Sequence, residues 1–398
     1  MVKLKLDQDI TLAAQPGSQR IRAFDVIRGY FLVVILIDHI ELYPNGWDLF
    51  TGRGRLLVSA AEGFFFMSGL LVGLVYRRRI AQGIKFIFAK MWRRAAELYI
   101  ASVFFTLLYT AAAVFLNHPS IKDGLYTISN WPHIIKETLL MRYGYGWADF
   151  LDRFAILMFM APFGFYMLIK RKWWLLLGAS LIAWALRGNS FTLSWQIIFT
   201  LGMLVGYHWH ELTARWQAVS RPLRSRIKRV VVVAALVTFL VSYASVYILS
   251  LLNEKWSQLP GWGQSFTGHW NSANAWVWQY SQKWTMGPLR IVLFMLWFGA
   301  LFMVVRRYEK QIAKYSHGLI ELLGRNSLFV YIAHSMIVFI FKLLLPTNTN
   351  FVENFLITGA ALFCLVAVTI AYKKLQPSIN LRPRRPDSLR TLIGSVKV

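Results

Sequence analysis

The stretch FDVIRGYFLVVILIDHIEL, residues Phe24–Leu42, combines two properties that rarely occur together. It is long and apolar enough to cross a bilayer, whose hydrocarbon core requires about 20 mostly apolar residues per helix. It also contains Asp25, Arg28, Asp38 and His39, and each of these side chains is costly to place in hydrocarbon. The stretch therefore predicts a membrane-spanning helix whose ionisable residues face protein rather than lipid.

Nine further segments share this apolar character, in a chain of 398 residues that is 57% hydrophobic and only 16% charged. Together with the first, they predict an all-α polytopic membrane bundle of about ten helices. The ten segments are Phe24–Leu42, Leu56–Tyr76, Ala96–Leu116, Asp152–Ile169, Trp173–Leu186, Thr192–Trp209, Val230–Leu252, Pro288–Val305, Ser327–Leu345 and Asn354–Tyr372.

The net charge of +26 raises the question of nucleic-acid binding, which the position of the charges answers. If odd-numbered segments run outward, cytoplasmic regions contain 32 of the 44 Lys and Arg residues and outer loops contain 8. The positive-inside rule then places both termini in the cytoplasm. Topology and attraction to anionic lipid headgroups account for the basic charge, so nucleic acid is not an expected partner.

This topology divides the chain into three parts. Residues 1–23 form a cytoplasmic N-tail, residues 24–372 form the transmembrane domain with outer loops at 117–150 and 253–287, and residues 373–398 form a basic cytoplasmic C-tail. The C-tail is rich in Pro and Arg and is expected to be disordered. The single cysteine, Cys364, precludes an internal disulfide and a zinc site built on cysteines, and we expect no metal.

The polar residues of the first segment share a helix face. At 3.6 residues per turn, Asp25, Arg28 and His39 form one stripe, and Arg28 and His39 are separated by about 16 Å along the helix. An interfacial salt bridge between Asp25 and Arg28, or an interhelical hydrogen bond of His39, would be purely structural explanations. His39 is the preferred catalytic candidate because imidazole can accept and return a proton near neutral pH. Asp38 projects about 100° away, towards a neighbouring helix or the outer headgroups.

The second segment, AAEGFFFMSGLLVGLVYRRR, places Glu62 at a depth similar to that of His39. A Glu62–His39 pair would fix the imidazole tautomer, whereas the alternative is that Glu62 extends to the outer headgroups. Gly69 and Gly73 form a small-residue face suited to close helix contact. The GMLVG of the sixth segment is too common a pattern to predict a contact. His334, in the ninth segment, is expected to lie deeper and to have a packing role.

Further polar residues collect at the outer level of the bundle, and individually each is more typical of a structural role. Their shared depth predicts a water-filled pocket that opens to the outside. These residues are Asp149, Asp152, Arg153, Gln196 and Arg290.

The outer loop at 253–287, NEKWSQLPGWGQSFTGHWNSANAWVWQYSQKWTMG, contains six of the 17 tryptophans. One interpretation is an aromatic belt at the membrane surface. The other is a sugar-binding surface, because flat aromatic faces beside amides and hydroxyls suit sugar rings. The candidate acceptor-binding residues are Trp270, Trp276 and Trp278, with Trp147 from the other long loop.

Four stretches together resemble the OpgC family, membrane succinyltransferases of osmoregulated periplasmic glucans within the transmembrane acyltransferase superfamily. They are RIRAFDVIRGYFLVVILIDHIE, with the family's R-x-x-D-x-x-R-G start and D-H end, AEGFFFMSGLLVGLVYRR, LSWQIIFTLGMLVG and LGRNSLFVYIAHS. The chain departs from the family in two places. Asp152-Arg153 replaces the usual apolar start of the fourth segment, and the Trp-rich loop matches no family pattern.

The resemblance implies a multi-pass protein of the bacterial inner membrane that uses acyl-CoA, with succinyl as the expected acyl group, and has no permanently bound cofactor. Its partners would be membrane lipids and an extracytoplasmic glucan. His39 would deprotonate the acceptor hydroxyl, with Glu62 and Asp38 beside it, and Gln196 or Arg290 would stabilise the oxyanion. The donor phosphates would bind a basic cytoplasmic group, with Asp25 next to it: Arg22, Arg28, Arg77, Arg78, Arg79, Arg93 and Arg94.

Other functions remain open at this point. The enzyme could transfer acetyl to a cell-wall or lipid-linked sugar. A transporter or flippase could use the same polar stripe as a substrate path, although the broken helices or inverted repeats typical of transporters are not visible in the sequence. A structural scaffold would not require His39 and Glu62 at matched depth.

Overall fold

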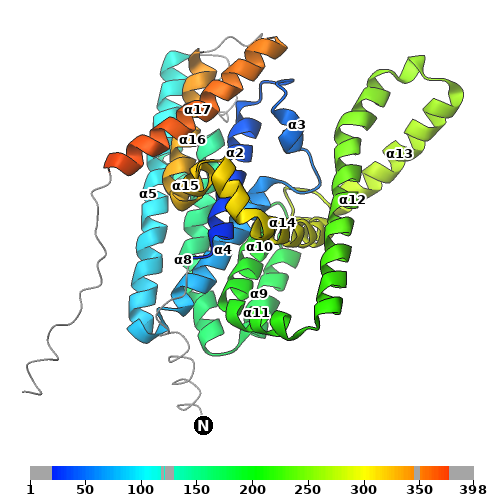
Figure 1. Ribbon diagram of the computed structural model, residues 1–398. Coiled ribbons are helices and arrows are strands. Elements are labelled where there is room, and N and C mark those ends of the chain that lie inside the picture. Colours follow the sequence, from blue (N-terminus) through cyan, green and yellow to red (C-terminus); the bar gives the residue numbers. More distant parts are fainter. Residues whose placement is uncertain (1–19, 118–120, 122–129, 345–349, 376–398) are drawn as a thin grey trace, which may run out of the picture.

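The computed structural model describes residues 20–117, 121, 130–344 and 350–375. Within these ranges every regular element is a helix, which confirms the expected all-α class (Figure 1). The N-tail before residue 20 and the C-tail after residue 375, including its expected disorder, lie outside the described residues.

All ten predicted segments overlap a helix. The helices are α2 (Arg22–Ile40), α4 (Ala60–Arg77), α5 (Ile84–Leu116), α8 (Asp149–Ile169), α9 (Trp173–Ala185), α10 (Phe191–Tyr207), α12 (Arg221–Glu254), α14 (Pro288–Tyr315), α16 (Ser327–Leu344) and α17 (Phe351–Leu375). Among the described residues, seven of them, α4, α5, α8, α12, α14, α16 and α17, are long and apolar enough to cross a membrane. The helices α9 and α10 are shorter, and α2 carries charged residues along its length, at Arg22, Asp25, Arg28 and Asp38.

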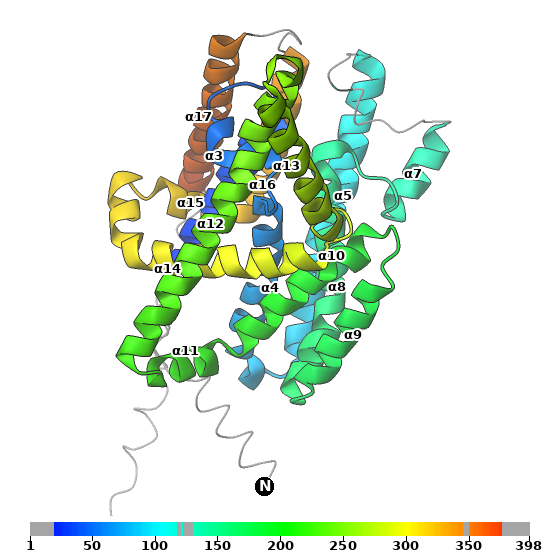
Figure 2. The same ribbon diagram turned by 90° about the vertical axis from the view of Figure 1, so that its right-hand side faces the viewer.

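Shorter helices occupy the connections. They are α3 (Asp48–Thr51), η1 (Gly52–Gly54), η2 (Ile80–Gln82), α7 (Trp131–Leu139), η3 (Gly146–Ala148), α11 (Trp209–Ala218), η4 (Trp256–Gln258), α13 (Gly261–Tyr280) and α15 (Leu319–Arg325). The Trp-rich stretch is therefore not an irregular loop, because α13 runs through 20 of its residues. Figures 1 and 2 show α13 folding back beside α12 as a helical hairpin.

Several helix starts follow local capping rules. The side chains of Asn130 and Ser190 accept hydrogen bonds from the main chain of the first turn of α7 and α10. Ser59 and Glu62 form a capping box at the start of α4, in which Glu62 accepts from the Ser59 main-chain N–H at 2.9 Å. These caps satisfy N–H groups that a helix leaves unpaired, which matters most where no water is available.

The helices are not all aligned. Figure 2 shows α14 lying across the direction of α4 and α12, with its N-terminal end beside α4 and α10. This end carries Arg290, which is almost fully buried and forms an ion pair with the fully buried Glu62 of α4. The crossing helix α14 is thus attached to α4 by a charge pair inside the bundle.

The closest helix contact joins α4 and α10 through glycines on both sides. A Cβ atom on Gly69 or Gly73 would overlap the main chain of α10, and one on Gly202 or Gly206 would overlap the main chain of α4. The predicted small-residue face of α4 is therefore confirmed. Its partner is the GMLVG pattern of α10, which the sequence alone did not distinguish from chance. Two glycine pairs let the backbones approach closely, as in other membrane helix pairs.

A second close contact holds α15 against the N-terminal half of α2. A Cβ atom on Gly29 would overlap the main chain at Ile320, and one on Gly324 would overlap the main chain at Asp25. The helix α2 also contacts α4, α14, α16 and α17, so it is surrounded by protein on most sides. The polar stripe of α2 consequently lies inside the bundle rather than against lipid.

The glycine contact predicts opposite effects for the same substitution at two helix positions. Replacing Gly by Ala normally favours a helix by about 1 kcal/mol. Gly202→Ala should nevertheless lower the thermal unfolding midpoint of the detergent-solubilised protein, because its Cβ would collide with the main chain of α4. Gly178→Ala on α9, where no atom lies within 4 Å of the added Cβ, should leave the midpoint unchanged or raise it. Equal effects at both positions would contradict the proposed packing role.

Candidate functional site

Two histidines from different helices meet inside the bundle. The Nδ1 atom of His39 on α2 lies 2.8 Å from the Nε2 atom of His334 on α16, and the ring centroids are 5.0 Å apart. The Nδ1 atom of His334 lies 2.9 Å from the carbonyl oxygen of Tyr331. A carbonyl only accepts hydrogen bonds, so Nδ1 of His334 must carry the hydrogen. With His334 neutral, its Nε2 then accepts from Nδ1–H of His39.

This chain of hydrogen bonds fixes the tautomer of neutral His39 and leaves a lone pair on its Nε2 atom. Among the described residues, that atom makes no hydrogen bond, and the His39 side chain is half-buried. His334 is fully buried. The arrangement therefore presents one oriented, accessible base, held by a second imidazole that has no access to solvent.

The expected Glu62–His39 pair is wrong. Glu62 is fully buried and is held by Arg290, and it also accepts from the Ser59 hydroxyl at 2.5 Å. The alternative, in which Glu62 extends to the headgroups, is wrong for the same reason. His334 is the partner of His39, a role that we expected of Glu62. It does more than pack against its neighbours, because its imidazole forms a hydrogen bond with His39. A buried histidine needs hydrogen-bond partners, and that requirement is the only sequence signal that pointed to His334.

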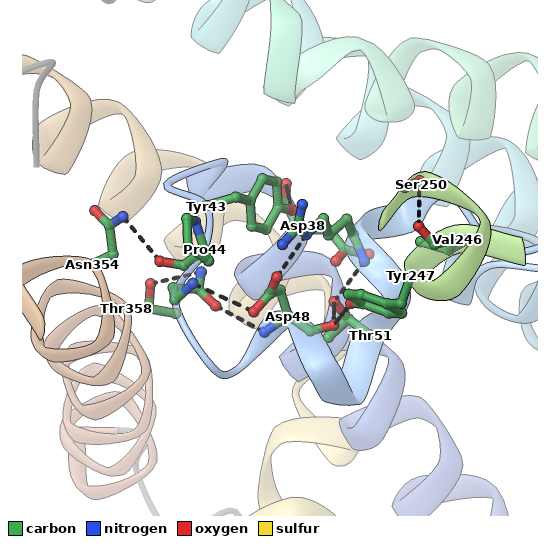
Figure 3. Close-up of polar contacts among 12 residues, drawn as sticks. Asp38, Tyr43, Pro44, Asp48, Thr51, Val246, Tyr247, Ser250, Asn354 and Thr358 are labelled. Carbon is green, nitrogen blue, oxygen red and sulfur yellow. Dashed lines mark hydrogen bonds and ion pairs between the residues drawn. The ribbon is translucent and has the colours of Figure 1, made fainter. Parts of the chain in front are cut away.

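Asp38 faces the connection between α2 and α4 rather than another long helix. A Cβ atom on Gly54 would lie 3.3 Å from a carboxylate oxygen of Asp38, and the Asp38 carbonyl accepts from the Tyr43 hydroxyl at 3.2 Å. Figure 3 shows Asp38 and Tyr43 in the polar cluster of this connection. Its position beside His39 in the chain therefore does not make Asp38 a partner of the imidazole.

The same connection is tied to α12 and α17 by polar contacts (Figure 3). Arg53 forms an ion pair with Asp48 at 2.6 Å, and its guanidinium lies 5.3 Å from the ring centroid of Tyr43 and 5.5 Å from that of Tyr247. The Tyr247 hydroxyl of α12 donates to the Asp48 carbonyl at 2.6 Å. On the other side, Asn354 of α17 donates to the carbonyl of Pro44 at 3.1 Å. These contacts hold a cap over the outer end of α2.

A cavity of about 510 Å³ lies among α2, α4, α5, α8 and α16. Its lining combines the cationic side chains of Arg28, Lys90, Arg93 and Arg94 with apolar side chains from α4, α5 and α8. It also reaches Tyr331, whose carbonyl holds His334. The cavity thus runs from a basic group on α5 to the residue that contacts the histidine pair.

Three of the cations are oriented by side chains within the cavity wall. Glu97 forms ion pairs with Arg93 at 3.2 Å and Arg94 at 3.0 Å. Arg28 donates to the hydroxyl of Ser327 at the start of α16, whereas its buried Nε atom makes no hydrogen bond to the described residues. A buried N–H without a partner is unusual and indicates a position where a bound group can accept a hydrogen bond.

The other predicted donor-binding residues do not line this cavity. Asp25 forms an ion pair with Arg20 at 2.5 Å, so the alternative of a salt bridge between Asp25 and Arg28 is not observed. Arg77 binds Glu211 of α11 through both nitrogens. Two more, Arg22 and Arg78, are also absent from the lining. Position along the chain placed these cations on the cytoplasmic side but not at the cavity, which depends on how α5 packs against α4 and α8.

The outer polar residues are engaged in separate contacts. Gln196 accepts from the Ser180 hydroxyl of α9 at 2.6 Å, so its amide is engaged with α9, and the oxyanion role expected for it stays a prediction. Arg290 is occupied by Glu62. Arg153 forms ion pairs with Asp149 at 3.0 Å and with Asp152 at 3.3 Å.

Of the four predicted acceptor-binding tryptophans, Trp147 is connected to the histidine pair through Tyr331. Its carbonyl accepts from the Tyr331 hydroxyl at 3.1 Å, and the ammonium of Lys342 lies 4.8 Å from its ring centroid. The other three belong to α13. Trp270 donates to the Ser245 hydroxyl of α12 at 3.2 Å, Trp278 lines a small cavity between α12 and α13, and Trp276 is 61% exposed.

Comparison with protein-family models shows that residues 20–376 match the family described as OpgC protein. The matched range includes both histidines and the whole lining of the cavity beside Arg28. No curated protein and no solved structure matches the chain. The family match covers nearly the entire chain and agrees with the apolar helices, which indicate a multi-pass membrane protein. The chain belongs to the OpgC family, and this membership indicates a membrane acyltransferase that acts on glucans.

Proposed function

We propose that the protein transfers an acyl group, expected to be succinyl, from cytoplasmic acyl-CoA to a hydroxyl of an extracytoplasmic glucan at the bacterial inner membrane, with His39 as general base. One observation carries this proposal. The cavity that begins among cations on α5 reaches Tyr331, and the carbonyl of Tyr331 anchors the histidine pair whose free nitrogen is Nε2 of His39.

The lining of the cavity suits the different parts of a coenzyme A donor. Arginine and lysine side chains bind phosphate groups strongly, and Lys90, Arg93 and Arg94 would bind those of coenzyme A. The apolar walls of α4 and α8 suit the uncharged pantetheine arm. The unpaired Nε–H of Arg28 would donate to an amide or phosphate oxygen of the donor along the way. The thioester would then lie near Tyr331 and the histidine pair.

In the transfer step, Nε2 of His39 removes the proton of the glucan hydroxyl as the hydroxyl oxygen attacks the thioester carbonyl carbon. The C–S bond then breaks, the acyl group stays on the glucan oxygen, and the coenzyme A thiolate receives the proton back from His39. His334 acts as a positioning residue, because its Nε2 accepts from Nδ1–H of His39 throughout. The donor and the acceptor thus approach the same nitrogen from opposite sides of the membrane.

The acceptor would approach past Trp147. This ring is partly buried, its main chain is bonded to Tyr331, and Lys342 lies against its face. An aromatic face combined with polar groups suits a sugar ring. The tryptophans of α13 would contact the glucan farther from the reacting hydroxyl.

The histidine pair predicts a graded loss of transfer activity. His39→Gln removes the base, so the rate of succinyl transfer from succinyl-CoA to glucan should fall by about 10²–10⁴-fold. His334→Gln offers a carbonyl oxygen that can still accept from His39, so its loss should be smaller than that of His334→Leu. Rates would be measured by mass spectrometry of the glucan product, with purified protein in nanodiscs. His210→Gln on the exposed helix α11 is the matched control. Retention of most activity by His39→Gln would exclude the general-base role.

The donor cavity predicts a selective loss of phosphate recognition. Arg94→Gln should lower kcat/KM for succinyl-CoA by about tenfold or more, since hydrogen bonds between charged groups contribute about 1.5–3 kcal/mol. Succinyl-pantetheine, which lacks the phosphates, should be used equally well by the variant and the parent protein. Arg226→Gln, an exposed residue in the first turns of α12 outside the cavity, is the control. An equal loss with both donors would mean that Arg94 maintains the structure instead of binding phosphate.

A further inference from the structure

A groove on the surface of the bundle lies between the start of α5 and the end of α8. Its volume is about 520 Å³, and its lining is mainly aromatic, with Phe88 and Trp92 from α5 and Phe163 and Tyr166 from α8. Figure 1 shows α5 at the edge of the bundle with α8 beside it. The indole N–H of Trp92 donates to the Phe159 carbonyl of α8 at 3.2 Å, so a hydrogen bond joins the two walls of the groove.

The groove is continuous with a surface that faces lipid. Both α5 and α8 are long and apolar enough to cross a membrane. Phe163 and Tyr166 are 47% and 43% exposed, and Ile100 and Phe104, farther along α5, are more than half exposed. On spanning helices, exposed apolar side chains contact the acyl chains of lipids. An acyl chain is therefore available beside the groove, and it would supply the van der Waals contacts that an empty groove lacks.

One end of the groove is cationic. Lys85, in the first turn of α5, lines it, and the ammonium of Lys170, just after the end of α8, lies 5.6 Å from the ring centroid of Tyr166. From this end the aromatic side chains continue for about 10 Å along α5. Among the described residues no acid lines the groove, and the sequence has no Asp or Glu in residues 63–96 or 153–210.

Two cations at one end and an apolar surface along the rest match the two parts of an anionic phospholipid. Basic pockets between spanning helices bind lipid headgroups that carry net negative charge, whereas phosphatidylcholine balances its phosphate with its own cation. A second apolar cavity, of about 320 Å³ between α12 and α14, differs because no cation is among the described residues that line it. Charge as well as apolar surface thus distinguishes the groove between α5 and α8.

We propose that the groove between α5 and α8 binds one anionic phospholipid. Lys85 and Lys170 bind its phosphate, and an acyl chain lies along the aromatic side chains towards Trp92. The groove shares no lining residue with the proposed donor cavity, although both use α5. The lipid and a coenzyme A donor therefore bind at separate places, and the lipid site does not depend on the proposed reaction.

The first test measures which lipid the purified protein retains. Protein in detergent would be mixed with equal amounts of phosphatidylglycerol and phosphatidylcholine of the same chain length, and bound lipid would be identified by native mass spectrometry. The parent protein should prefer phosphatidylglycerol. Lys85→Gln combined with Lys170→Gln should lower its affinity for phosphatidylglycerol by about tenfold or more. Lys228→Gln combined with Lys314→Gln removes two exposed lysines outside the groove, and the affinity should stay within about twofold.

A second pair of variants tests the apolar part of the site. Ala89→Trp places a large ring in the groove and leaves both lysines, so less phosphatidylglycerol should bind. Ala96→Trp is the matched control, because Ala96 is exposed on α5 two turns later, outside the lining of the groove. Neither alanine lines the proposed donor cavity.

Photo-crosslinking of the unmodified protein keeps the test decisive if a variant folds poorly. The protein would be irradiated with phosphatidylglycerol that carries a diazirine in its acyl chain, and the adducts would be mapped by peptide mass spectrometry. Adducts are expected within residues 84–92 and 163–166, which contain the lining of the groove. Excess coenzyme A should not reduce them, because the groove and the donor cavity are lined by different residues.

Several outcomes would overturn the proposal. Equal binding of both phospholipids by the parent would mean that the groove selects no headgroup, and an equal loss in both double lysine variants would mean that only overall charge matters. Unchanged binding in Ala89→Trp, or adducts confined to other segments, would place the lipid elsewhere. Loss of the adducts with coenzyme A would assign the groove to the donor. None of these measurements uses transfer activity, so failure of the proposed function would leave them unchanged.

Discussion

The interior of a membrane offers no water to polar groups, so each polar side chain on α2 must find its partner within the protein. Two of these partners come from α16, since Arg28 donates to Ser327 at its start and His39 donates to His334 farther along. The two contacts fix α16 beside α2. They also place Tyr331 between them, at the edge of the proposed donor cavity. The requirement to satisfy polar groups on one helix thus determines where the cavity meets the base.

The helices were predictable because an apolar run of sufficient length is a local property of the chain. The contacts between helices were less predictable. GMLVG on α10 is a common pattern, and only its position opposite Gly69 and Gly73 of α4 shows that it is an interface. The helix α13 was missed because its residues mix Gly, Asn, Ser and Trp without an apolar period, and its contact with α12, through Trp270 and Ser245, is not local.

The part of the site that lies on one helix was predictable, whereas the contact that we expected between two helices was wrong. The stripe that carries Arg28 and His39 follows from helical periodicity, and both residues line or adjoin the proposed path. Equal depth suggested that Glu62 pairs with His39, but depth does not specify which way a side chain faces. Glu62 faces Arg290 instead, because α14 crosses beside the start of α4. No local signal in the sequence reports such a crossing.

The choice of imidazole over carboxylate as the partner of His39 has an electrostatic rationale. A carboxylate at that position would be a second buried anion, and the one nearby, Glu62, is already balanced by Arg290. A buried charge without its own counter-charge is strongly destabilising. His334 instead orients His39 through a neutral hydrogen bond. In the proposed mechanism, the only charge that His39 then introduces is the proton it holds during transfer, and that proton leaves with the coenzyme A thiol. A neutral pair therefore gives the base its orientation without a permanent charge inside the membrane.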